Sequence, residues 1–187
     1  MVFSGLTSTR VQSLYGIKLP AILTGLERGD LTDYEASTPG LGYSVAYRGG
    51  PVVATLYIYD LGLDEIPEGP KSKVVEEAYL GAVGDAVNSS QYEEVDVLSQ
   101  TYSGSEPHGP EFLHAAIAAL EKSSLGYRAV MTHVFVTGHK NKFVKIRASV
   151  SGDAPEKNRV PESFAAELAT LFRADIAAGS ADEPVDH

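Results

Sequence analysis

The 187-residue chain contains no cysteine. This absence excludes disulfide bonds, catalysis by a thiolate and zinc sites built from cysteine. The chain also lacks any run of the roughly 18 to 20 apolar residues that a membrane-spanning helix requires, and its first residues lack the basic start and apolar segment of a signal peptide. We therefore expect no membrane span. The expected compartment is the cytoplasm by default, or an exported one if a leader has been removed.

Positive charge is scarce. Fifteen Lys and Arg stand against 25 Asp and Glu, which gives a formal net charge of −10. A basic surface is needed to neutralise phosphates, so this balance argues against nucleic acid as a partner. The cations are unevenly placed, however, because one short stretch without any acid holds four of them: Lys140, Lys142, Lys145 and Arg147.

The apolar fraction of 43% and the charged fraction of 21% are ordinary for a globular chain. Length and composition predict a single domain over residues 1–187, with residues 1–13 and 180–187 forming loose ends.

Residues 129–150 form the pattern around which the chain is organised. Val and Thr dominate the first half, and the second half alternates with the two-residue period of a strand. We expect an antiparallel hairpin with a loop of three or five residues centred on Lys140. This loop would set His133 opposite Arg147 on a charged face and two valine-containing pairs on an apolar face. The expected pairs are Val136–Val144, Val134–Ile146, Phe135–Lys145 and His133–Arg147.

Further strands are predicted from alternating or extended patterns. They lie at residues 14–19, 34–37, 43–48, 52–60, 92–102 and 127–137. Residues 112–121 have helical propensity, but a turn after them would make them the antiparallel neighbour of 127–137, so we favour a strand there. Residues 21–33 receive no assignment.

Two amphipathic helices are predicted. Ser72 is a suitable N-cap for the first helix, which ends near Asn88. Its internal Gly81 and Gly84 suggest a close contact between helix and sheet. The second helix has Pro161 at its first position and Gly179 as its stop. The expected buried stripes are Val75, Tyr79, Ala82, Val83 and Ala86 in the first helix, and Phe164, Leu168, Leu171, Phe172 and Ile176 in the second.

These elements predict an α+β fold, in which a mainly antiparallel sheet of six to seven strands carries one helix on each face. Three runs, DYEASTPGLGYSVAYR, ATLYIYDLG and TGHKNKFVKIR, resemble a family of bacterial proteins of unknown function that are often predicted to be exported. The order of elements is also similar to the Mog1/PsbP-like fold. That resemblance implies a binding role, since members of the fold mostly bind proteins such as a small GTPase or a photosystem complex.

The cationic stretch is the first candidate site. A hairpin tip carrying Lys140 and Lys142, followed by Lys145 and Arg147, can bind a phosphate, a carboxylate or an acidic protein surface. The alternative is structural: lysines protect an exposed hairpin, and the other two cations pair with acids in the sheet.

The second candidate site combines aromatic and acidic residues. Tyr57, Tyr59 and Asp60 end an inner strand beside a loop and can line a small pocket, although tyrosine is also an ordinary strand residue. His133 beside a cation would be a neutral base, or simply a packed histidine. No metal or cofactor is expected, because none of the five histidines (His108, His114, His133, His139 and His187) forms a metal-binding spacing.

Two functions follow. The favoured one is a non-enzymatic binding or accessory domain that recognises a protein or a small anionic partner through the cationic hairpin. The alternative is a small-molecule-binding protein or a hydrolase with a pocket near Tyr57, Asp60 and His133. No catalytic residue is assigned, because the sequence shows no complete triad.

Overall fold

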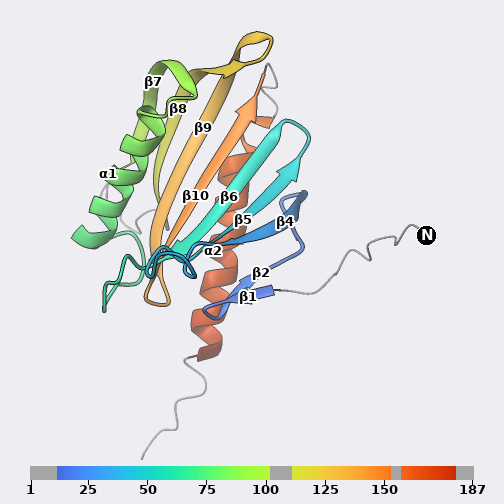
Figure 1. Ribbon diagram of the computed structural model, residues 1–187. Helices are drawn as coiled ribbons and strands as arrows, with labels where there is room; N and C mark the ends of the chain where they lie inside the picture. The colour runs from blue at the N-terminus through green and yellow to red at the C-terminus, as the bar shows by residue number, and fades with distance from the viewer. Residues whose placement is uncertain (1–11, 102–110, 153–156, 180–187) are drawn as a thin grey trace, which may run out of the picture.

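The computed structural model describes residues 12–101, 111–152 and 157–179. It contains an antiparallel sheet of eight strands, a separate two-stranded hairpin and two helices (Figure 1). The predicted α+β class with a helix on each face of the sheet is confirmed, with eight strands in place of six or seven. The elements are β1 (Gln12–Leu14), β2 (Ile17–Leu19), β3 (Ile22–Leu23), β4 (Leu26–Asp33), β5 (Tyr43–Gly49), β6 (Val52–Tyr59), α1 (Lys73–Val87), β7 (Tyr92–Thr101), β8 (Leu113–Ser123), β9 (Gly126–His139), β10 (Lys142–Ser151) and α2 (Val160–Gly179).

The strand order in the large sheet is β3-β4-β5-β6-β10-β9-β8-β7, and every neighbouring pair is antiparallel. The β9–β10 hairpin therefore lies at the centre, next to β6. No helix of the described residues is long and apolar enough to cross a membrane. Most of the expected loose ends, together with Tyr102, His108 and His187, lie outside the described residues.

The two helices cover opposite faces of the sheet. α2 packs against β10, β9 and β3, over a core that includes Phe164 and Leu168 of the helix. α1 packs mainly against β9 and β8, over a second core that includes Tyr79. Figure 1 shows α1 beside β7 and β8 on the near face and α2 behind the sheet. On the near face, neither helix of the described residues covers β5 and β6.

The predicted hairpin exists, but its predicted register is wrong by one residue. Lys140 and Asn141 form a two-residue turn with φ of 50° and 57°, as tight hairpins require. Strand pairing continues directly on both sides of this turn. A slip of one residue moves every side chain of one strand to the other face relative to its partner. The observed pairs are Thr137–Val144, Val136–Lys145, Phe135–Ile146, Val134–Arg147 and His133–Ala148.

The corrected register changes the character of both faces. Phe135 joins Ile146 in the core under α2, while Val134 and Val136 join the core under α1. Along β10 the α2 face is apolar and the opposite face carries Lys145 and Arg147, as expected. The expected placement of the β9 side chains is wrong, because Val134 and Val136 share the face of the two cations and make it mixed. His133 and Arg147 consequently lie on opposite faces of the sheet.

The remaining differences are local. The segment 14–19 is two short strands around a turn at Tyr15 and Gly16, because both have positive φ. Residues 34–37 form turns in place of an extended strand, with the amide of Thr38 donating to the carbonyl of Tyr34. The unassigned segment 21–33 contains β3 and β4. Residues 112–121 are confirmed as strand for all but Phe112, which lies just before β8.

The helix predictions hold in most details. Ser72 caps α1 by accepting a hydrogen bond from the amide of Val75, Asn88 is its C-cap, and all five residues of the expected stripe are buried. In α2, Ile176 is 47% exposed and is not a core residue. The close contact between helix and sheet that was expected at Gly81 and Gly84 is absent, since a Cβ at either position would meet nothing within 4 Å.

Candidate functional site

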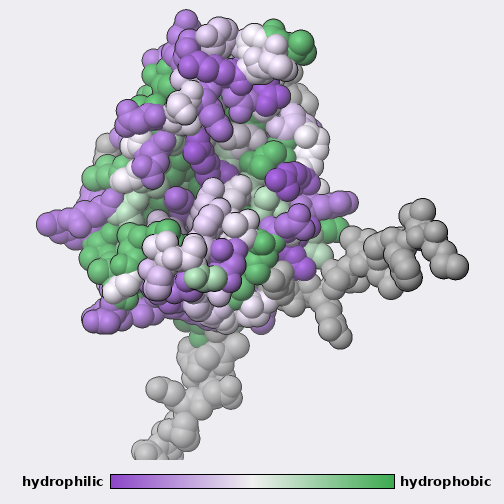
Figure 2. Space-filling view, viewed as in Figure 1, coloured by the Kyte–Doolittle hydropathy of each residue, from purple (hydrophilic) through white to green (hydrophobic). Residues whose placement is uncertain are grey.

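A groove of about 660 Å³ lies between α1 and the uncovered part of the sheet. Its volume is in the range of small-molecule sites. The space-filling view shows a hollow on this face, with hydrophobic surface gathered at its lower end (Figure 2). The lining residues come from one side of α1 (Val74, Glu77, Ala78, Gly81, Ala82 and Asp85), from β6 and β10 (Tyr57, Tyr59, Phe143 and Lys145) and from nearby loops (Tyr34, Leu41, Leu61 and Leu63).

The strand register explains the floor of the groove. Lys145 pairs with Tyr57, and Phe143 pairs with Tyr59, so all four side chains point to the face that carries α1. The lysine ammonium lies 4.4 Å from the centroid of the Tyr57 ring and 5.6 Å from that of Tyr59. The floor is therefore aromatic, with one cation held over two rings.

The helix wall of the groove gives a reason for one of the two glycines inside α1. Gly81 lines the groove and has open space where a Cβ would stand. A glycine inside a helix costs about 1 kcal/mol relative to alanine, and no close packing offsets that cost here. An absent side chain at this position keeps the groove wide.

Burial shapes the ionisation of the groove residues. It lowers the pKa of Lys145, an effect that Asp85 opposes and Arg147 reinforces. Burial, with a contribution from Asp85, raises the pKa of Tyr59 to about 12. Tyr59 is thus a neutral hydroxyl at physiological pH. Within the described part of the chain, no carboxylate lies within ion-pair distance of Lys145.

Arg147 extends the polar part of this face. It lies two residues beyond Lys145 on β10, which places their Cα atoms roughly 7 Å apart. Its guanidinium lies 5.4 Å from the centroid of the Tyr92 ring. The Tyr92 hydroxyl lies 3.0 Å from Oγ1 of Thr132, which is 3.0 Å from the Ser149 hydroxyl. Burial raises the pKa of Tyr92, but hydrogen bonds from Thr132, Arg147 and Ser149 together hold it below its ordinary value.

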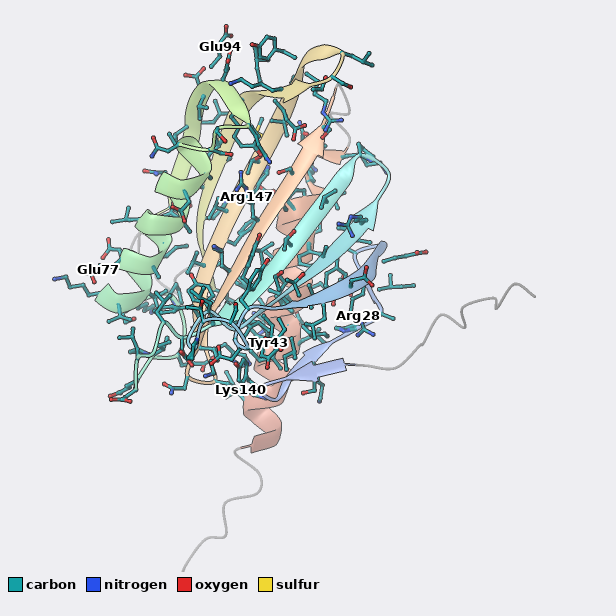
Figure 3. All side chains as sticks on the ribbon, in the orientation of Figure 1. Arg28, Tyr43, Glu77, Glu94, Lys140 and Arg147 are labelled. Atoms are coloured by element: carbon teal, nitrogen blue, oxygen red, sulfur yellow. The ribbon has the colours of Figure 1, made fainter. Side chains whose placement is uncertain are left out.

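The hairpin tip is a separate region. Figure 3 shows Lys140 near Tyr43 at the lower end of the molecule and Arg147 far up the sheet. The Lys140 ammonium donates to the carbonyl of Gly16 at 2.6 Å. Lys142 forms an ion pair with Asp60 and lies 4.3 Å from the ring centroid of Tyr15. The four cations of the stretch therefore do not form one surface, and both tip lysines bind other parts of the chain.

Asp60 and His133 also lie apart from the groove. Asp60 directly follows β6, which ends one residue earlier than predicted, and its carboxylate binds Lys142 and the amide of Gly62. His133 lies on the α2 face, where its Nδ1 is 2.9 Å from Nε2 of His114. The expected pocket of Tyr57, Asp60 and His133 is thus not formed, whereas Tyr57, Tyr59 and Lys145 do line one groove.

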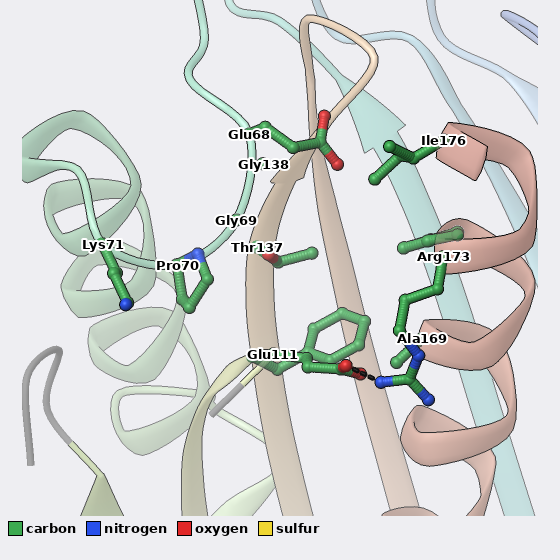
Figure 4. Close-up of a pocket in the computed structure, with 12 residues that line it drawn as sticks. Glu68, Gly69, Pro70, Lys71, Glu111, Thr137, Gly138, Ala169, Arg173 and Ile176 are labelled. Carbon is green, nitrogen blue, oxygen red and sulfur yellow. Dashed lines mark ion pairs between the residues drawn. The ribbon is translucent and has the colours of Figure 1, made fainter. Parts of the chain in front are cut away.

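A smaller cavity of about 190 Å³ lies between α2 and β9. Figure 4 shows Glu111 and Arg173 joined by an ion pair at its side, with Thr137 and Gly138 on the strand beside it. Near this cavity, His139 stacks on Phe172 with ring centroids 4.0 Å apart and contacts Glu68 through Nδ1 at 2.5 Å. Nε2 of His139 is buried without a hydrogen bond to any described residue, and the volume of the cavity is below that of most ligand sites.

Comparisons with known proteins place the fold in context. No protein-family model matches the chain, and no curated protein matches its sequence. Among solved structures, the Ran-binding protein Mog1p of Saccharomyces cerevisiae is similar over 92% of this chain and 94% of its own, with 10% sequence identity and a TM-score of 0.38. This likeness is one of overall architecture, and the function proposed below rests on the groove alone.

Proposed function

We propose that this protein is a non-enzymatic binding domain whose groove takes an amphipathic organic anion, with an aromatic or aliphatic body and a carboxylate or similar head group. The observation that carries the proposal is Lys145, a half-buried cation over two tyrosine rings with no ion-pair partner within the described residues. A desolvated cation binds an anion more strongly than an exposed one, because water competes less.

The position of each group fits such a ligand. Arg147 lies further along the same face of β10 and, like Lys145, has no acidic partner in the described parts of the chain. Leu41, Leu61 and Leu63 supply apolar surface to the lining. All three leucines are largely exposed: Leu61 to 55%, Leu63 to 44% and Leu41 to 43%. A ligand that covered them would add hydrophobic burial to the head-group contact.

The competing functions have less support. The hydrolase alternative needed His133 beside Tyr57 and Asp60, and His133 lies on the other face of the sheet. The sequence predicted that Lys140 and Lys142 at the hairpin tip bind a protein or an anion. In the structure, Lys140 instead donates to the carbonyl of Gly16 in the β1–β2 turn, and Lys142 forms an ion pair with Asp60. The proposal therefore assigns the anion to Lys145 and Arg147.

The test uses two fluorescent probes that share an aromatic body. One is 8-anilinonaphthalene-1-sulfonate, which carries an anionic group, and the other is neutral N-phenyl-1-naphthylamine. Lys145→Met keeps the aliphatic stem and removes the charge. We expect it to weaken binding of the sulfonate about tenfold, equal to about 1.4 kcal/mol, and to leave the neutral probe within about threefold.

Gly81→Leu fills the groove, and Gly84→Leu is its matched control. Gly84 does not line the groove and also has open space around its Cβ position. Gly81→Leu should weaken both probes at least tenfold, and Gly84→Leu should weaken neither. The proposal fails if neither probe binds the folded wild type, or if Lys145→Met and Gly81→Leu both bind like the wild type.

A further inference from the structure

Three metal-ligating side chains meet on the α2 face, away from the groove. His114 comes from β8, His133 from β9 and Glu162 from the first turn of α2. Each offers one ligand atom, and these atoms all lie within 4.8 Å of one another. The three residues are far apart in sequence, so no local sequence motif predicts this cluster.

The sheet fixes the two imidazoles. His114 pairs with Phe135, and His133 pairs with Ala116, across β8 and β9. The two histidine rings are nearly parallel, at 8°, with centroids 5.1 Å apart. The ring of Phe135 stacks on His114 at 4.2 Å. Rings held by strands and by stacking have little freedom to reorient, which is what a preorganised ligand pair needs.

One nitrogen of this pair lacks a partner. His133 is 5% exposed, and its Nε2 is buried without a hydrogen bond to any described residue. Its Nδ1 is the atom that contacts Nε2 of His114. A neutral imidazole has one donor nitrogen and one acceptor nitrogen, so either tautomer of His133 leaves a buried polar atom unsatisfied. Buried groups of this kind are rare in folded proteins and call for an unseen partner.

We infer that His114, His133 and Glu162 form a site for a divalent transition-metal ion of the Zn²⁺, Co²⁺ or Ni²⁺ class. Two imidazoles and one carboxylate form a ligand set that suits zinc and leaves a fourth position for water. Calcium and magnesium, which take oxygen ligands, fit this set poorly.

The distances are compatible with such an ion. Metal–nitrogen bonds of about 2.0–2.1 Å place two ligands of a tetrahedral ion roughly 3.4 Å apart. The ligand atoms of the three residues already lie within 4.8 Å of one another, so small side-chain shifts bring them to this spacing. Glu162 is exposed and can close the remaining gap by rotating its side chain. Its exposure also gives an ion a route from solvent.

An ion bound between the two rings would replace their hydrogen bond. The proton of that bond would pass to the other nitrogen of its ring or to solvent, because a ligating imidazole nitrogen carries no proton. A bound ion would tie the start of α2 to β8 and β9.

The test is a Zn²⁺ titration of the untagged full chain after chelator treatment, followed by calorimetry and thermal unfolding. We expect one ion per chain. At a free Zn²⁺ concentration 100 times Kd, Tm should rise by about 5–10 °C. With Co²⁺, a visible absorption band of tetrahedral type should appear.

Glu162→Gln is the main variant, because the exposed side chain can change without disturbing the core. It should weaken Zn²⁺ binding at least tenfold, and His114→Gln should weaken it further. Glu167→Gln, on the same helix and outside the cluster, should bind within twofold of the wild type. The inference is overturned if the wild type binds no Zn²⁺ with Kd below about 100 µM. It is also overturned if binding persists unchanged in Glu162→Gln and His114→Gln, since the ion would then occupy another position.

Discussion

The two faces of the sheet are closed to different degrees. The 20-residue helix α2 buries Phe164 and Leu168 completely against the middle strands. The 15-residue helix α1 buries its own stripe against β8 and β9 but leaves a groove over β6 and β10. The α2 face thus supplies most of the stabilising core, and the α1 face retains room for a ligand. Four substitutions measure this difference.

The largest effect is expected on the closed face. Phe164 is fully buried, with its ring 5.2 Å from that of Tyr47. Phe164→Ala should lower the free energy of unfolding by about 3–5 kcal/mol, because it removes a large buried side chain and leaves a cavity. Leu61→Ala, at the groove, should change it by less than about 0.5 kcal/mol. Denaturant unfolding measures both, and comparable losses would show that the two faces are equally closed.

An intermediate effect is expected at the hairpin tip. Lys142→Met breaks the ion pair with Asp60. The side chain of Lys142 is only 17% exposed and that of Asp60 only 20%. We expect a loss of about 1 kcal/mol at pH 7. The hydrogen bond from Lys142 lowers the pKa of Asp60 below its ordinary value of 3.8, against a raising effect of burial.

The pH dependence of that loss has a definite sign. A carboxyl with a lowered pKa stabilises the folded state above its ordinary pKa, and the contribution fades as pH falls through the lowered value. The difference between wild type and Lys142→Met should therefore be full above about pH 4 and shrink in stronger acid. A difference that stays constant down to pH 2 would exclude the ion pair as its cause.

The smallest effect, of opposite sign, is expected in the groove. Burial lowers the pKa of Lys145 below its ordinary 10.5, so the charged form costs stability at pH 7. Lys145→Met should raise Tm slightly, by less than about 4 °C. The wild type should approach the variant as pH rises towards 10.5, since the folded lysine has then lost its proton. A variant that is less stable at pH 7 would indicate that Lys145 serves the fold.

The sequence was sufficient for the periodic elements. Both helices, the capping by Ser72 and the central hairpin follow from spacing alone. The register did not follow, because the expected loop had an odd number of residues centred on Lys140, whereas the observed turn has two residues. In the structure Gly138 lies within β9, where a Cβ would stand 1.9 Å from the carbonyl oxygen of Pro67. The glycine is required by this close approach of a loop, and the turn itself uses Lys140 and Asn141.

The candidate sites depend on contacts between distant segments. Alternation along single strands was enough to place Tyr57 and Tyr59 on one face and Lys145 on the charged side of its strand. That these residues share a groove follows from the pairing of β6 with β10 and from the position of α1, which local patterns do not specify. The cluster of His114, His133 and Glu162 joins three elements and has no local signal.

The hairpin turn at the tip has two residues, so an insertion there has a different effect on the strand register when it adds an odd or an even number of residues. One inserted residue would exchange inward and outward positions along a whole limb, removing His133 from Glu162 and Val134 from its packing partners. Two inserted residues would restore the alternation. Natural homologues that vary in length at residues 140–141 should therefore differ by even numbers, unless a bulge elsewhere in the hairpin compensates.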